Sequence, residues 1–363
     1  MTNIVTSHRD LIDDLIRQLF GVEPDVMASL AHDDAEVRLR LAEDETPTDP
    51  LDGLDVFARR TVAACVAMRR HGAAVSLLTE RQARAVGWPT ARLANMCLTL
   101  AWGLFISSQP SMALPVLIEA DEDATGAVRL LARAGRDLPS YGRLIRALHR
   151  DRAVDGASRE RIDRRSAPVR EGHRLVSLSE RLRDWLGVDA TAVELPSDRC
   201  GPRIASPNAR AACVVAWLAV ETLDMGAVMQ RERITAVRLK TDEDAQLAGQ
   251  PGAAAANLAL LLGAAINHAS GYTVHVLPAR SDVATALVEA GRGLDVRWGG
   301  TRADREAEVV AVLDMTDLAA RGYVHVGQDA ARRVAERLIE DRAREAVART
   351  PATADEAAAP GRR

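Results

Sequence analysis

Hydrophobic residues recur at helical spacing through most of the first 150 positions. Ser7 is a good N-cap, and one apolar face follows it over residues 11–19. The same spacing predicts short helices at 25–32 and 35–43 and a longer helix over 54–70. No run in this half alternates as a strand does. We therefore expect residues 1–150 to form an all-helical N-terminal domain.

The pattern changes at a polar, Arg-rich stretch, residues 151–175. Such a charge run is typical of a linker or an exposed helix, and a contact for nucleic acid or an acidic partner is the alternative. Helical and strand-like runs alternate beyond it, so residues 176–348 are expected to form an α/β or α+β domain with a small sheet. The fold class is thus mainly α, and residues 349–363 are expected to be a disordered tail. The predicted helices are 177–186, 209–231, 253–268, 282–290 and 329–348, and the predicted strands are 234–240, 272–277, 296–298, 309–313 and 323–326.

Two long stretches, residues 93–118 and 246–279, lack charged side chains and are long enough to cross a bilayer. Prolines and polar residues interrupt both of them. We expect the first to form a buried helix, a turn and a second short helix, and the second to lie in the core. The first 13 residues have no secretory pattern, so we expect a cytoplasmic protein without a membrane partner.

The composition predicts the kind of core and disfavours some partners. The chain is 47% hydrophobic, 27% charged and only 3% aromatic, which predicts folded cores built from Ala, Leu and Val. The formal charge of −4 disfavours whole-molecule attraction to nucleic acid. The four cysteines include no CxxC pair and are too scattered for a disulfide framework, so we expect free thiols in a reducing compartment. No repeat occurs at solenoid periods.

One segment, residues 79–96, has the spacing of a helix-turn-helix. Ala83 would lie where two helices touch, Gly87 would accept the turn, and Leu93 would anchor the second helix. The start of a recognition helix meets base edges, so this interpretation assigns DNA contacts. The alternative is a helical hairpin inside an all-α domain, because the second helix continues without charge. The DNA-contacting residues would be Thr90, Arg92 and Asn95.

An alternative site lies in the second half. Glu221 and Asp224 are three residues apart on an apolar helix and could share an acid–base or metal-binding face. Asn257 and His268 are eleven apart on another helix, and His268 could act as a general base. The structural alternatives are solvent-facing or arginine-paired carboxylates, and a histidine that only stabilises a helix end.

Common catalytic signatures are missing from the sequence. It contains no GxxxxGK[ST], GxGxxG, GxSxG or HExxH motif, so we predict no cofactor and no metal. The segment 253–276 superficially resembles the nucleotide-binding helix of histidine-kinase-type ATPases. It departs from them at Ala264, where that family has asparagine, and no DxGxG loop follows.

Three functions stay open from the sequence alone. The first is a non-catalytic DNA-associated or regulatory protein. The second is an enzyme built on the second-half residues, and the third is a scaffold that assembles with itself through Ala-rich helices. We favour the first, because it rests on a spacing rule rather than on isolated residues.

Overall fold

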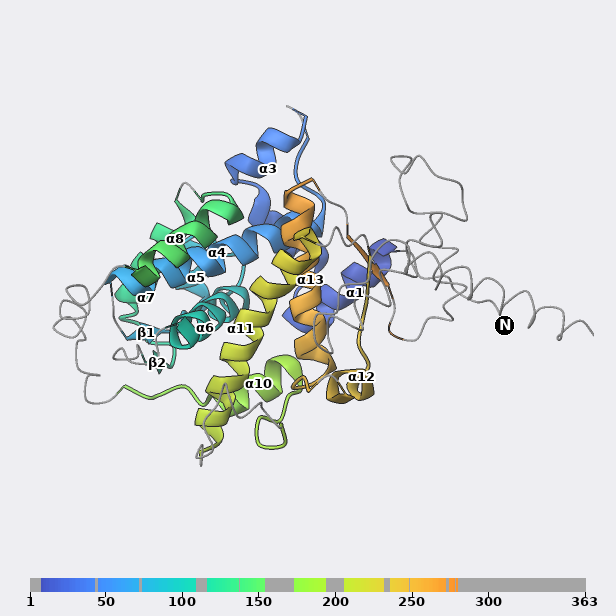
Figure 1. Ribbon diagram of the computed structural model, residues 1–363. Helices are drawn as coiled ribbons and strands as arrows, with labels where there is room; N and C mark the ends of the chain where they lie inside the picture. Colours follow the sequence, from blue (N-terminus) through green and yellow to red (C-terminus); the bar gives the residue numbers. More distant parts are fainter. Residues whose placement is uncertain are drawn as a thin grey trace, which may run out of the picture. The chain divides into compact units, whose positions relative to one another are not determined.

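The protein is mostly helical, with two short pairs of parallel strands in the part that the structure describes (Figure 1). The computed structural model describes residues 8–42, 45–71, 74–108, 116–136, 138–153, 173–193, 206–231, 236–247, 249–271, 274–277 and 279. The chain divides into two compact units, residues 1–280 and 281–363, and every described residue belongs to the first. The elements predicted beyond residue 281 and the C-terminal tail therefore lie outside the described residues.

Four helices form the core of this unit: α4 (Pro50–His71), α6 (Ala91–Ser108), α11 (Pro207–Arg231) and α13 (Ala253–Ala269). α4 packs against α6 and α11 against α13, while α6 also packs against α11 and α13 against α4 (Figure 1). Helices from both sides of residues 151–175 thus share one core, where the sequence had led us to expect a domain boundary.

Shorter helices cover this core and carry the exposed charges. α2 and the 3-10 helix η1 pack against α4, α7 and α8 pack against another part of α4, and α10 packs against α11. The bounds of α1, α2 with η1, α3 and α10 agree with the predicted helices at 11–19, 25–32, 35–43 and 177–186, whereas the sequence predicts no separate helix at α7 or α8. The elements are α1 (His8–Phe20), α2 (Pro24–Ala28), η1 (Ser29–Ala31), α3 (Ala35–Arg40), α7 (Thr125–Gly135), α8 (Tyr141–Ala153) and α10 (Leu178–Leu186).

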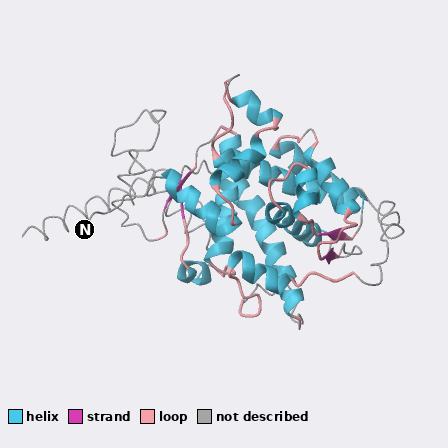
Figure 2. Ribbon diagram, turned by 180° about the vertical axis from the view of Figure 1, so that it is seen from behind, coloured by secondary structure: helices cyan, strands magenta, loops and turns pink. Residues whose placement is uncertain are grey.

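Each strand pair is parallel and short. β1 (Val75–Ser76) pairs with β2 (Leu117–Ile118), and β3 (Ala236–Arg238) pairs with β4 (His275–Leu277). Figure 2 shows the two pairs on opposite sides of the helices. β3 and β4 lie within predicted strands. The expectation of a strand-free first half is wrong, because two-residue strands are too short for alternation to reveal. The second short helix expected before residue 118 falls mainly on residues 109–115, which lie outside the described residues.

One arrangement of elements occurs twice. β1, α5 (Glu80–Ala85), α6 and β2 follow the same order as β3, α12 (Asp242–Leu247), α13 and β4. In the first copy the N–H of Leu78 donates to Asn95 Oδ1 (2.7 Å), and Asn95 Nδ2 donates to the carbonyl of Leu78 (3.0 Å). In the second, Lys240 and Asn257 make the same two bonds at the same distances. The two sets of residues are 162 positions apart in the sequence.

Further contacts repeat at the same offset. Gln82 N–H donates to Thr79 Oγ1 at the start of α5, as Asp244 N–H donates to Thr241 Oγ1 at the start of α12. The turns that follow contain glycines at φ +76° and +67°. Identical residues occupy equivalent positions without a gap, namely Leu77 and Leu239, Thr79 and Thr241, Ala83 and Ala245, Gly87 and Gly249, Pro89 and Pro251, and Asn95 and Asn257.

The repeat extends to α1 and α10. Each helix ends at a glycine with φ +63°, Gly21 and Gly187. An arginine in the last turn pairs with a carboxylate six residues later, Arg17 with Glu23 at 2.9 Å and Arg183 with Asp189 at 3.7 Å. In this repeat α4 corresponds to α11 and α6 corresponds to α13. The packing of α6 against α11 therefore corresponds to the packing of α13 against α4. The described unit therefore contains two copies of one arrangement of helices and strands, 162 residues apart, which is longer than the usual solenoid periods.

Two further features qualify expectations from the sequence. α11 is long and apolar enough to cross a bilayer by length and composition alone, but 61% of its most apolar window is buried against neighbouring parts of the protein. This core position accounts for its composition.

Cys65 and Cys97 are buried free thiols as expected, whereas Cys213 is disulfide-bonded.

Candidate functional site

The segment 79–96 does form two helices joined by a tight turn. Ala83 and Leu93 are fully buried, and Gly87 adopts φ +76° in the turn between α5 and α6. The spacing therefore indicated the backbone geometry correctly. The same geometry recurs in the second copy between α12 and α13, so it is a general element of this fold and not a feature of one DNA-reading segment.

The three residues assigned to DNA contacts are engaged within the protein. Thr90 Oγ1 accepts a hydrogen bond from the N–H of Leu93 (3.3 Å) and caps α6. Both polar atoms of Asn95 are bonded to the backbone of Leu78. The guanidinium of Arg92 lies against Gly21, and burial lowers the pKa of Arg92. α6 itself lies between α4 and α11, so this geometry favours the hairpin alternative.

The four alternative active-site residues do not all lie within reach of one small ligand. Glu221 is buried on α11, and Asp224 lies one turn further along. Burial and the nearby Asp224 carboxylate together raise the pKa of Tyr141. Asn257 holds the backbone of Lys240, about 16 Å along the α13 axis from His268. No small substrate could contact both ends of α13 at once.

His268 lies beside a cluster of charges. Its Nε2 is 3.7 Å from Asp52 Oδ1, which is 3.1 Å from Arg40 Nη2. Burial is the largest influence on Asp52 and raises its pKa, and Arg40 and then His268 oppose this. The arrangement joins the ends of α3 and α13 to the start of α4.

At the centre of this cluster lies Arg59, which is 1% exposed. Its guanidinium donates to both oxygens of Asp34, at 2.8 and 3.1 Å, and to Asp55 at 2.9 Å. Asp34 also accepts the N–H groups of Glu36 and Val37 and so caps α3. This buried network fastens α3 to α4. Its signal in the sequence is an Asp and an Arg four residues apart in an apolar helix, and the sites predicted from the sequence do not include it.

Asp55 is fully buried, and burial raises its pKa to about 6 despite Arg59. One of its oxygens, Oδ1, has no hydrogen-bond partner among the residues that the structure describes. The guanidinium groups occupy the space between these carboxylates. Within the described ranges, no group of three or more His, Cys, Asp and Glu side chains is arranged to hold a metal ion.

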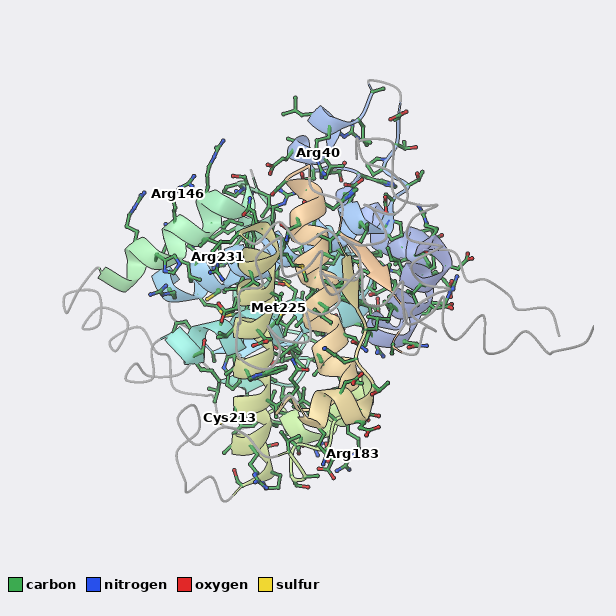
Figure 3. All side chains as sticks on the ribbon, turned by 45° about the vertical axis from the view of Figure 1, so that its right-hand side comes forward. Arg40, Arg146, Arg183, Cys213, Met225 and Arg231 are labelled. Atoms are coloured by element: carbon green, nitrogen blue, oxygen red, sulfur yellow. The ribbon has the colours of Figure 1, made fainter. Side chains whose placement is uncertain are left out.

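A pocket of about 1050 Å³ lies between α1 of the first copy and residues of the second copy. α1 contributes Leu15, Gln18 and Leu19, and the end of α10 with the turn after it contributes residues 183–189. The turn before α13 and the first two residues of α13 contribute residues 249–254. Figure 3 shows Arg183 at this end of the molecule, near α10 and α12. The lining mixes apolar and polar side chains, as ligand sites usually do.

Exposed arginines gather on α7, α8 and the turn between them. The sequence from Thr125 to Arg150 contains six arginines and one acidic residue, Asp137. α8 buries Leu144 and Leu148 against α4 and exposes its arginines on the other side. Figure 3 shows Arg146 extending outward from α8. We call the exposed residues Arg129, Arg136, Arg143, Arg146 and Arg150 the arginine face.

Comparisons with known proteins assign no relationship to this chain. No protein-family model matches it, and neither a curated protein nor a solved structure shows significant similarity. Function must therefore be argued from the pocket, the charge cluster and the arginine face themselves.

Proposed function

We propose that this chain is a non-catalytic DNA-associated protein that contacts the phosphate backbone through the arginine face. The observation that carries the proposal is the concentration of exposed guanidinium groups on α7 and α8 in a protein of net charge −4. Arginine suits phosphate recognition because its planar group presents several donors in a fixed geometry. A local basic surface can attract DNA where the whole molecule cannot.

The spacing on α8 supports this contact. Arg143, Arg146 and Arg150 follow an i, i+3, i+7 pattern and so share one face over about 10 Å of helix. Each strand of duplex DNA carries one phosphate per roughly 3.4 Å of axis. Three guanidinium groups can therefore meet successive phosphates. Contacts of this kind position a protein on DNA but do not read its sequence.

The proposed DNA contact lies on α7 and α8 and not on α5 and α6. Thr90, Arg92 and Asn95 serve capping and packing roles. The side chains of Arg143, Arg146 and Arg150, in contrast, extend from the exposed side of α8 and are accessible to a partner. Residues 154–172, which lie outside the described ranges, follow α8 directly and contain five arginines and four acidic residues.

Fluorescence anisotropy with a labelled DNA duplex, repeated over a range of salt concentrations, tests the proposal. The variant Arg143→Gln/Arg146→Gln/Arg150→Gln removes three cations from α8. We expect weaker binding and a plot of log affinity against log salt that is shallower by about 2 to 3, because each lost phosphate contact removes about 0.9 from the slope.

The matched control is Arg81→Gln/Arg84→Gln/Arg181→Gln, which removes three cations from α5 and α10. It changes the net charge equally and should retain most of the affinity and the salt slope. An equal loss in both variants would show a nonspecific charge effect. A loss confined to the control would return the DNA contact to α5. Either result overturns the proposed surface.

A further inference from the structure

The two copies differ most in the space beside the glycine that ends α1 or α10. Arg92 of the first copy corresponds to Ala254 of the second, at the same offset of 162 residues. In the first copy the Arg92 guanidinium fills this space, since a Cβ built on Gly21 would lie 2.6 Å from its Cζ. In the second copy a Cβ on Gly187 would meet no described atom within 4 Å.

A second substitution enlarges the same space. Trp88 is buried in the first copy and packs edge-on against Phe57, with ring centroids 6.0 Å apart. Its counterpart, Gln250, lines the pocket of the second copy together with Ala254 and Gly187. The pocket is thus the second copy's version of a space that the first copy fills with its own side chains.

From these differences we infer that the pocket binds a small organic cation that carries a guanidinium or ammonium group. The first copy shows that the fold accommodates a guanidinium at the corresponding position. Asp184, Asp189 and Asp242 lie on the pocket lining. Among the described residues of this lining the one cationic side chain is Arg183, already paired with Asp189. Arg92, outside the lining, interacts electrostatically with Asp184, which leaves Asp242 as the lining carboxylate without a cationic partner among the described residues. The lining is therefore net negative and complements a cation.

An unused acceptor points to the same chemistry. Gln250 Oε1 is buried and has no hydrogen-bond partner within the described part of the chain. A buried acceptor without a donor is costly, and guanidinium and ammonium groups are donors only. Leu15, Leu19 and Val188 provide apolar surface for a hydrocarbon stem. A ligand with a cationic head and a short aliphatic chain matches the negative lining, the unpaired acceptor of Gln250 and the apolar surface.

Isothermal titration calorimetry with agmatine tests the inference, with N-butylurea as the neutral probe of similar length. We expect agmatine to bind one site per chain at least tenfold more tightly than N-butylurea. The variant Ala254→Arg restores the residue of the first copy and should reduce agmatine affinity at least tenfold. Gln250→Trp restores the other first-copy residue and should also reduce agmatine affinity at least tenfold. It provides a second test of the pocket if one of the two variants fails to fold.

The control is Ala85→Arg, which adds the same charge at an exposed position of α5 outside the pocket. It should bind agmatine as the unmodified protein does. Equal affinity for the two probes would overturn the inference, as would agmatine binding that survives in both folded pocket variants. Loss of agmatine binding in Ala85→Arg would show that net charge, and not the pocket, determines the affinity. That result would also overturn the inference.

Discussion

Asn95 and Asn257 hold equivalent backbone positions in the two copies, each by accepting one hydrogen bond from a residue seventeen positions earlier and donating another to it. Each asparagine lies in the first turns of a core helix and fixes the segment that leads into the preceding short helix. The pair explains why a polar residue is placed within each of these apolar helices. Both side-chain amides are therefore bonded to the backbone, and Asn257 also lines the pocket.

Replacing either asparagine by alanine should destabilise the protein by about 2 to 3 kcal/mol, because a backbone donor and acceptor lose their partners. Urea denaturation of Asn95→Ala and Asn257→Ala measures this cost. Asn208→Ala, at the exposed start of α11, is a matched control and should cost less. Unchanged stability in either core variant would contradict the structural role assigned to that asparagine.

The sequence predicted the helices well, because their apolar faces are long enough for periodicity to show. α1, α10, α11 and α13 begin and end within a few residues of the expected positions. The two-residue strands β1 and β2 carry no such pattern, because alternation cannot be seen over two positions. Val75 and Leu117 pair across 42 positions of sequence, and no local pattern indicates such a partner.

The repeat is visible in the sequence, since residues 74–108 and 236–270 align without a gap. Its offset of 162 lies far beyond solenoid periods, so a prediction confined to those periods does not find it. The roles of individual polar residues are not visible. Arg92 and Asn95 satisfy a DNA-reading pattern, and only tertiary contacts with Gly21 and Leu78 show how they are used. The residue spacing therefore predicts the turn but not the groups that its side chains contact.

The crossing of α6 and α11 depends on a glycine. A Cβ built on Gly103 would lie 2.7 Å from Val215 Cγ1 and 2.8 Å from its carbonyl oxygen. Gly103→Ala should therefore destabilise the protein by about 1 to 3 kcal/mol, because the two helices must separate. Thermal unfolding measures the effect, and Gly126→Ala in α7 is the control, since its Cβ would meet no described atom within 4 Å.

The control should be neutral or slightly stabilising, because alanine favours a helix over glycine. A Gly103→Ala variant as stable as the unmodified chain would contradict the close approach of the two copies. This pair of variants therefore tests the shared core directly.

Arg92→Ala separates the two interpretations of the α5–α6 turn. We expect a change in unfolding free energy below about 1.5 kcal/mol, since Nε is buried without a partner among the described residues and the lost contacts are mainly packing. DNA affinity should stay within about twofold of the unmodified protein, as measured by anisotropy, because the half-buried Arg92 guanidinium packs against Gly21 and the proposed phosphate contacts lie on α7 and α8. A large selective loss of affinity would restore α6 as the reading helix.

The carboxyl of Asp55 should make stability depend on pH in a defined direction. Its pKa rises from 3.8 to about 6 because burial disfavours its charged form. The folded state therefore holds this proton more tightly than the unfolded chain does. The stabilisation from Asp55 is present in full below its unfolded pKa and is lost as pH rises through the folded pKa.

Urea denaturation of the unmodified protein and of Asp55→Asn over a range of pH isolates this contribution, because the other titrating groups are common to both. The difference in unfolding free energy, unmodified protein minus variant, should fall between pH 3.8 and about 6 and then become constant. A difference that grew over this range would mean that Arg59 dominates and holds the pKa of Asp55 below its usual value. Arg59→Met should be strongly destabilising, by about 3 to 5 kcal/mol, because it leaves Asp34 and Asp55 buried without their cation.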